Sequence, residues 1–119
     1  MLRMTPSPQV YLAAGVTDLR NNIDGLAIMV EKNFHLDPFS KSLFVFCNRK
    51  RNKIKILFWD KNGFWLYYRR LEEGTFKWPT KADYGKTLMI SEQQLSWILD
   101  GLSLEEKRAH KEVLKRKII

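Results

Sequence analysis

The sequence predicts an α+β fold, with an antiparallel β-meander of about three to five strands, one amphipathic helix packed on it and two short C-terminal helices. Three aromatic and β-branched runs, 43–47, 53–59 and 64–70, are separated by turn-forming residues, as in a meander. Apolar residues at helical spacing predict the amphipathic helix at 18–34. The length of 119 residues favours a single domain over 1–119, with a core at about 10–102 and a basic C-terminal helix at about 103–117.

The predicted helix has recognisable ends. Thr17 is expected to be its N-cap, and Asp18 lies in its first turn, where the helix dipole favours an anion. Gly25 disfavours a helix interior, so we expect it to allow close packing of the helix against the sheet. Pro38 follows shortly and is expected to end the helix.

Two shorter runs extend the predicted strands. Residues 10–13 (Val-Tyr-Leu-Ala) are β-prone, and 75–78 (Thr-Phe-Lys-Trp), closed by a proline, is a candidate edge strand. The second hairpin contains Asp-Lys-Asn-Gly, and Gly63 is expected to take the positive φ that such turns need.

Turn geometry predicts the register of the meander and therefore its two faces. A three-residue loop at 61–63 pairs Trp59 with Trp65, while the first hairpin pairs Val45 with Ile56. The face that we expect under the 18–34 helix then holds Leu43, Val45, Cys47, Ile54, Ile56, Phe58, Leu66 and Tyr68. The other face holds Phe44, Phe46, Lys55, Leu57, Trp59, Trp65, Tyr67 and Arg69.

The second face mixes aromatic and cationic side chains and has two interpretations. It packs under another element or forms a dimer interface, or its rings stack on bases as in single-stranded nucleic acid platforms. The candidate interaction residues are Phe44, Phe46, Trp59, Trp65 and Tyr67.

Positive charge is concentrated in two parts of the chain. Lys and Arg number 21 and Asp and Glu 13, which gives +8. Residues 41–86 carry twelve basic and four acidic side chains, and 107–117 six and one, whereas 1–40 has a net charge of −1. Such clusters favour a polyanionic partner, because Lys and Arg release the counterions condensed on phosphates. The candidate nucleic-acid-binding residues are Arg49, Lys50, Arg51, Lys53, Lys55, Arg69, Arg70 and Lys77.

The C-terminal part predicts two helices. Ser91 and Gln94 have the spacing of a capping box at the start of a helix at about 92–100, and Gly101 is a candidate C-cap. A basic helix at about 104–116 follows. The pair is compatible with a helix-turn-helix, or the second helix is a solvated basic tail.

Sequence features of catalysis are missing. The two histidines have no metal-ligand spacing, no glycine-rich phosphate loop occurs, and the carboxylates are scattered, so we expect no metal, no cofactor and no enzymatic activity. Cys47 is expected to be a core residue. No apolar run suits a signal peptide or a membrane span, which predicts a cytoplasmic protein with access to the nucleoid.

An ordered set of motifs resembles the TnpB-type accessory proteins of the insertion-sequence-66 family. These motifs are Val10–Ala13, Gly15–Arg20, Ile23–Ala27, Leu36–Ser40, Leu43–Phe46, Asn48–Arg51, Ile54–Leu57, Trp59-Asp60, Gly63–Tyr68, Arg70–Glu72, Phe76–Pro79 and the segment from Gln94-Leu95 to Gly101-Leu102. Asn21-Asn22 departs from the pattern, which usually has Lys-Gly there. The resemblance implies an element-encoded protein that assists a separate transposase in transposition, a form of DNA recombination, and it brings no catalytic residues.

Three functions follow as hypotheses. The chain is a DNA-binding helper at the element ends, or a protein-interaction adaptor that docks the transposase or forms a homodimer through the aromatic face. The third hypothesis is an RNA chaperone-like binder, which would prefer single strands to duplex.

Overall fold

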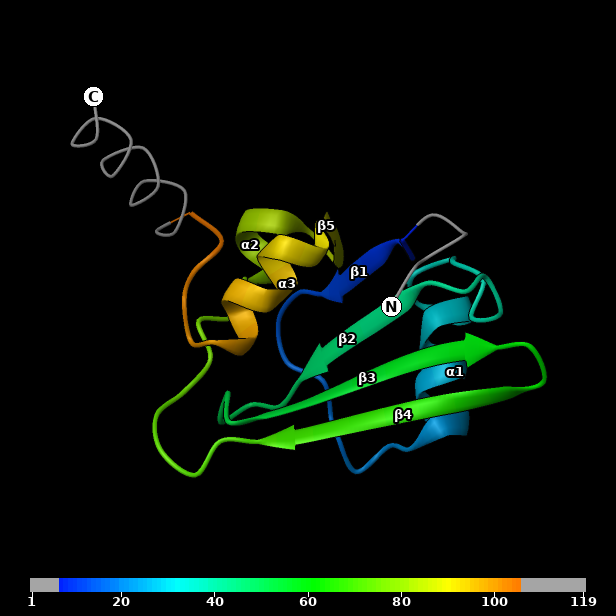
Figure 1. Ribbon diagram of the computed structural model, residues 1–119, viewed down its shortest axis with the longest axis horizontal. Helices are drawn as coiled ribbons and strands as arrows, with labels where there is room; N and C mark the ends of the chain where they lie inside the picture. The colour runs from blue at the N-terminus through cyan, green and yellow to red at the C-terminus, as the bar shows by residue number, and fades with distance from the viewer. Residues whose placement is uncertain (1–6, 106–119) are drawn as a thin grey trace.

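The computed structural model describes residues 7–105, which form one five-stranded sheet and three helices (Figure 1). The predicted α+β class is confirmed. The elements in chain order are β1 (Val10–Ala13), α1 (Ile23–Lys32), β2 (Leu43–Cys47), β3 (Lys53–Asp60), β4 (Gly63–Arg70), α2 (Lys81–Tyr84), β5 (Thr87–Ile90) and α3 (Glu92–Leu99). None of these helices combines the length and the apolar character that a membrane crossing requires.

The strands lie in the order β4-β3-β2-β1-β5 and are mostly antiparallel. β2, β3 and β4 pair antiparallel in chain order, and β5 pairs antiparallel with β1. β1 and β2 are parallel neighbours, a pairing that the prediction of a meander did not include. A parallel pair needs a connection that crosses one face of the sheet, and α1 lies on this connection.

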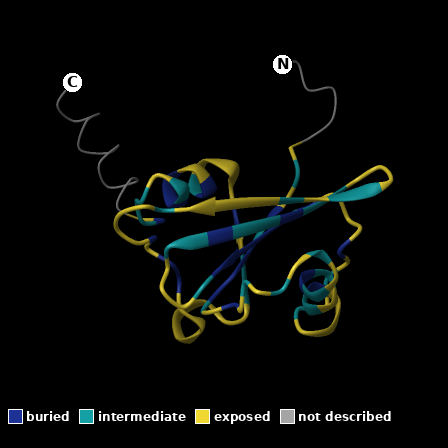
Figure 2. Cartoon of the chain, turned by 90° about the horizontal axis from the view of Figure 1, so that it is seen from below, coloured by how far each residue is buried: buried dark blue, intermediate teal, exposed yellow. Residues whose placement is uncertain are grey.

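Apolar residues pack against both faces of the sheet, with α1 on one side and α3 on the other, while β4 is largely exposed (Figures 1 and 2). Leu26 and Val30 of α1 pack with Phe44, Phe46 and Leu57 on one face. The other face carries Val10, Leu12, Val45, Cys47 and Ile54, and it packs with Phe76, Trp78, Leu95 and Ile98. The helix therefore covers the face opposite to the predicted one. Alternation shows which residues share a face, but because both faces of β2 are apolar it does not show which face the helix takes.

The hairpin between β3 and β4 differs by one residue from the predicted register. Phe58 pairs with Trp65 and Asp60 with Gly63, so Lys61-Asn62 is a two-residue loop. Lys61, with φ 54°, adopts the left-handed conformation that the prediction assigned to Gly63. The predicted register of the first hairpin is confirmed, with Val45 opposite Ile56.

The helix α1 is shorter than the predicted 18–34. It begins after Asn22, which is its N-cap in place of Thr17, a buried residue. It ends because His35 takes a left-handed φ of 54°, while the backbone N–H of Leu36 donates to the carbonyl of Val30, before the expected proline is reached. A left-handed residue just after the last turn is typical of a helix C-terminus.

Side chains of the turn before α1 account for Gly25. The guanidinium of Arg20 binds the carboxylate of Asp18, and Asn21 Nδ2 donates to the Asp18 carbonyl at 3.1 Å. A Cβ on Gly25 would lie 2.7 Å from Asn21 Oδ1. The glycine thus makes room for this turn, and the expected close packing on the sheet is not the reason for it.

The predicted edge strand at 75–78 is not a strand. Phe76 and Trp78 are buried against the sheet face opposite α1, and Trp78 Nε1 donates to the carbonyl of Ala13 at 2.9 Å. The backbone N–H of Phe76 donates to the carbonyl of Arg51 at 2.7 Å. The segment therefore fills the core with alternate aromatic side chains, a pattern that also suits a strand.

The C-terminal part agrees with the sequence as far as it is described. The capping box of Ser91 and Gln94 opens α3, and Gly101 takes a φ of 83° just after the helix. The short helix α2 and the strand β5 were not predicted. The predicted basic helix at about 104–116 lies almost entirely outside the described residues.

Candidate nucleic-acid interface

The basic turn between β2 and β3 is held in shape by Asn48. Its Oδ1 accepts from the backbone N–H groups of Asn52 and Lys53, each at 3.0 Å, and its Nδ2 donates to Asn52 Oδ1 at 2.8 Å. These bonds close the turn without help from the basic side chains. Arg49, Lys50 and Arg51 are all exposed on it.

Arg51 occupies a backbone conformation that favours glycine. Its φ of 58° is left-handed, which costs a residue with a Cβ about 1–2 kcal/mol. The backbone around it is fixed, since the Arg51 carbonyl accepts from Phe76 N–H and the Asn52 carbonyl accepts from Leu71 N–H. These two hydrogen bonds hold the turn in the conformation that Arg51 requires.

A second wall faces this turn and comes from distant parts of the chain. The backbone N–H of Thr17 donates to the Cys47 carbonyl at 2.8 Å, and that of Gly15 donates to the Pro79 carbonyl at 2.9 Å. Gly15 has a φ of 77°, and a Cβ there would lie 2.9 Å from Lys81 Cγ. Because Gly15 has no side chain, the stem of Lys81 can lie across it.

The two walls enclose an open groove with a volume of about 1360 Å³. Its floor includes Leu66 and Tyr68 of β4. The only acidic residue among the described residues that line it is Asp18. The basic residues that line it are Arg20, Arg49, Lys50, Arg51, Lys53, Lys55 and Lys81.

Two of these seven cations are already engaged. Arg20 forms an ion pair with Asp18 at 2.6 Å, and its hydrogen bonds lower the pKa of the Asp18 carboxyl to about 2, so this pair stays charged and adds no net charge near neutral pH. Lys55 Nζ donates to the carbonyls of Leu19 at 2.6 Å and Asn21 at 3.1 Å, and to Asn22 Oδ1 at 2.9 Å.

Lys55 therefore ties β3 to the turn before α1 and uses all three of its N–H donors. The side chains of the other five cations make no hydrogen bond or ion pair within residues 7–105. These five, hereafter the groove cations, are Arg49, Lys50, Arg51, Lys53 and Lys81.

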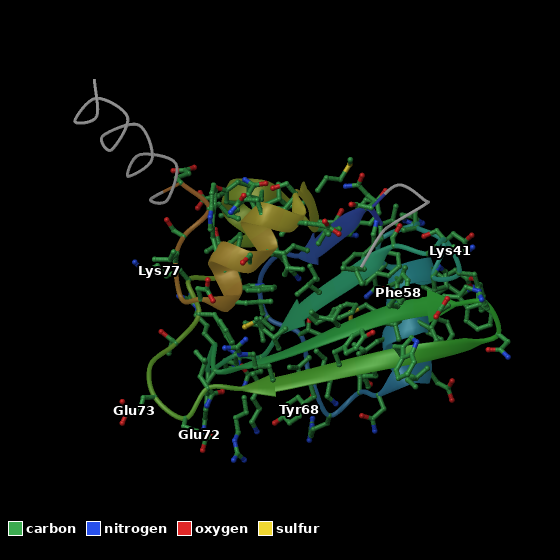
Figure 3. All side chains as sticks on the ribbon, in the orientation of Figure 1. Lys41, Phe58, Tyr68, Glu72, Glu73 and Lys77 are labelled. Atoms are coloured by element: carbon green, nitrogen blue, oxygen red, sulfur yellow. The ribbon has the colours of Figure 1, made fainter. Side chains whose placement is uncertain are left out.

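The groove gathers five of the eight predicted nucleic-acid-binding residues, Arg49, Lys50, Arg51, Lys53 and Lys55. Arg69, Arg70 and Lys77 do not line it, and Arg70 pairs with Glu72 at 2.9 Å. Figure 3 shows Lys77 well away from Tyr68. Arg20 and Lys81 were not predicted to belong to this site, because no local pattern connects them to the basic turn.

The predicted aromatic face does not exist as one surface. Phe44 and Phe46 are buried under α1, and Trp59 packs edge-on against Phe64, with ring centroids 5.0 Å apart. The one-residue change of register moves Trp65 and Tyr67 to the opposite face of β4. There they stack with centroids 6.1 Å apart and remain exposed.

Within the part of the chain that the structure covers, no three His, Cys, Asp or Glu side chains gather as metal ligands would. Cys47 is a buried core residue as expected, and burial raises the pKa of its thiol to about 12.

The fold and the groove together define a small α+β protein that presents a row of cations in one concave site. The chain belongs to the family described as IS66 Orf2 like protein, whose model matches residues 8–109. It is therefore an insertion-sequence-associated accessory protein, in agreement with the resemblance of its sequence motifs.

Two relatives come from Sinorhizobium fredii (strain NBRC 101917 / NGR234). The chain is 37% identical over 102 residues to the uncharacterized protein y4hO, and the aligned region covers 83% of this chain and 87% of the relative. It is 28% identical over 94 residues to the uncharacterized protein y4jC, covering 79% of each chain. No solved structure matches the chain.

Proposed function

We propose that this protein is a non-catalytic helper of transposition that binds DNA at or near the ends of its insertion sequence, beside a separate transposase. The observation that supports DNA binding most directly is the set of five groove cations. They line one groove, and their side chains make no hydrogen bond or ion pair with other described residues. Cations that are not neutralised within the protein are suited to a polyanion.

The number of groove cations predicts how steeply DNA binding should depend on salt concentration. If each of the five groove cations contacts one phosphate of duplex DNA, the logarithm of the binding constant should fall against the logarithm of salt concentration with a slope of about −4.5. Arg20 and Lys55 are left out of this count because their charged groups are engaged within the protein. A slope near zero for element-end DNA would contradict the proposal.

A pair of charge-matched variants tests the location of the site. Arg49→Gln/Lys50→Gln removes two groove cations, whereas Lys41→Gln/Lys61→Gln removes two exposed lysines that do not line the groove. Figure 3 shows Lys41 at the end of the sheet opposite Lys77. Both variants have the same net charge, so a general effect of charge weakens both equally.

We expect the groove variant to reduce the magnitude of the salt slope for element-end DNA by about 1.8, because two phosphate contacts are lost. Its binding at moderate salt should be weaker by tenfold or more. The control variant should bind almost as the unaltered protein does. The measurement is fluorescence anisotropy over a salt series, with and without the transposase. Equal losses in the two variants, or no loss in either, would show that the groove is not the DNA site.

The exposed pair Trp65 and Tyr67 supports a second role, contact with the transposase. Large exposed rings that stack on each other are typical of protein interfaces, and these two lie on the face of β4 that points away from the groove floor. Trp65→Ala/Tyr67→Ala should abolish retention of the transposase while DNA binding stays unchanged. Met89→Ala, at an exposed apolar residue of β5, is the control. Retention that persists in the double variant would contradict this role.

A further inference from the structure

One exposed aromatic ring lies among the groove cations. Tyr68 lines the groove and its residue is 55% exposed, whereas Trp78, which also lines it, is only 6% exposed. The other large aromatic residues that are similarly exposed, Phe39, Trp65, Tyr67 and Tyr84, do not line the groove. Tyr68 is therefore the ring that a ligand in the groove would meet.

The surroundings of Tyr68 are fixed before any ligand binds. Its strand is hydrogen-bonded along β3, where Tyr68 pairs with Lys55. Lys55 Nζ lies 6.0 Å from the centre of the Tyr68 ring and is itself held by three hydrogen bonds to residues 19–22. The Tyr68 ring thus has a fixed position at the floor of the groove, and the groove cations line the groove around it.

Duplex and single-stranded DNA would meet such a site differently. In a duplex the faces of the bases are covered by their neighbours, so only phosphates are available to a shallow groove. In a single strand the bases can turn toward the protein and stack on an aromatic ring while cations follow the backbone. Cations alone would serve either form, but an exposed ring at the floor of the groove serves the single strand.

We propose that the groove binds single-stranded DNA, with one base stacked on Tyr68 and the phosphates on either side held by groove cations. This inference rests on the proposed function and adds to it a preference for unpaired DNA over duplex. It assigns Tyr68 to the groove side of β4, and the neighbouring Tyr67 to the side that points away from it.

The two adjacent tyrosines provide a matched test. Tyr67 and Tyr68 are 49% and 55% exposed and point to opposite faces of β4, and Tyr67 does not line the groove. The probes are a fluorescein-labelled dT15 and a 15-base-pair duplex of mixed sequence, titrated by anisotropy at moderate salt. Tyr68→Ala should weaken binding of dT15 by about 5- to 150-fold, the range for one stacked base. The duplex should lose less than about twofold, since it does not stack.

Further variants separate stacking from folding. Tyr67→Ala should bind dT15 as the unaltered protein does, and Tyr68→Phe should retain binding because it keeps the ring. Tyr68→Leu keeps apolar bulk on the strand without the ring, so it should lose affinity as Tyr68→Ala does. Equal effects at Tyr67 and Tyr68, equal losses for dT15 and duplex, or a preference of the unaltered protein for duplex would overturn the inference.

The outcome also distinguishes this inference from the proposed function. If Arg49→Gln/Lys50→Gln loses DNA while Tyr68→Ala binds dT15 normally, DNA binding in the groove holds and stacking is wrong. If neither substitution changes binding of either probe, both proposals fail. A loss confined to dT15 in Tyr68→Ala, together with losses for both probes in the cation variant, is the result that both proposals require.

Discussion

Lys53 and Lys55 lie two residues apart on the same face of β3, yet the structure gives them different roles. Lys53 is one of the groove cations, whereas Lys55 Nζ donates to the Leu19 carbonyl, the Asn21 carbonyl and Asn22 Oδ1. Methionine keeps most of the stem length of lysine and removes the charge. Lys55→Met should therefore reduce stability, and Lys53→Met should reduce phosphate contacts.

The size of each effect follows from these contacts. A partly buried hydrogen-bonded ammonium contributes about 1.5–3 kcal/mol, so Lys55→Met should lower the free energy of unfolding by about 2 kcal/mol. Lys53→Met removes no such bond and should change it by less than about 0.5 kcal/mol. In DNA binding Lys53→Met should have the larger effect. It should reduce the magnitude of the salt slope by about 0.7–0.9, whereas Lys55→Met should leave the slope unchanged.

Urea unfolding followed by circular dichroism measures the first quantity, and anisotropy over a salt series measures the second. The salt slope is the better readout for Lys55→Met, since a loosened wall at residues 19–22 can weaken binding without removing a phosphate contact. Normal stability of Lys55→Met would show that its three hydrogen bonds do not hold the wall. If its salt slope falls as much as that of Lys53→Met, the ammonium contacts phosphate and the count of five groove cations is wrong.

The remaining predictions concern stability and reactivity. Trp78→Phe leaves the Ala13 carbonyl without its indole donor and should lower the free energy of unfolding by about 1–3 kcal/mol, and unchanged urea unfolding would contradict that contact. Ser91→Ala removes the cap of α3 and should cost about 1 kcal/mol, whereas the exposed Ser96→Ala in the same helix should cost much less, so equal losses would argue against the cap. Burial raises the pKa of the Cys47 thiol to about 12, so a thiol reagent at pH 8 should label it only after unfolding. Rapid labelling of the native protein would refute the burial. Because the unfolded thiol ionises near its ordinary pKa of 9.0 and the folded thiol does not, the free energy of unfolding should also decline between about pH 9 and 12, by at most about 1.4 kcal/mol per pH unit.

Local chemistry accounts for the parts of the fold that the sequence predicts well. The runs that become β2, β3 and β4 are aromatic and β-branched between turns, and the box of Ser91 and Gln94 fixes where α3 begins. The register of the first hairpin is also local, since Val45 opposite Ile56 follows from the length of one turn. Each of these features depends on residues within a few positions of one another.

Features set by distant segments could not be predicted in this way. The helix α1, which packs on Phe44 and Phe46, lies on the crossover between the parallel strands β1 and β2, a pairing that neither strand signals by itself. Lys81 reaches the groove because its stem lies across Gly15, more than 60 residues earlier in the chain. The basic turn was visible in the sequence, but the wall that makes it a groove was not.

The hairpin between β3 and β4 shows how one turn residue decides what a surface can do. With a three-residue loop, Arg69 would share a face with Lys55, Trp65 and Tyr67, and aromatic and cationic side chains would form one platform. Lys61 instead takes the left-handed conformation, the loop shortens to two residues, and every side chain of β4 changes face relative to β3. Tyr68 then joins Lys55 at the groove, while Trp65 and Tyr67 stack on the far side. The mixed surface that suggested either base stacking or a protein interface thus becomes two surfaces on opposite sides of one strand, and each of the two interpretations has a surface of its own.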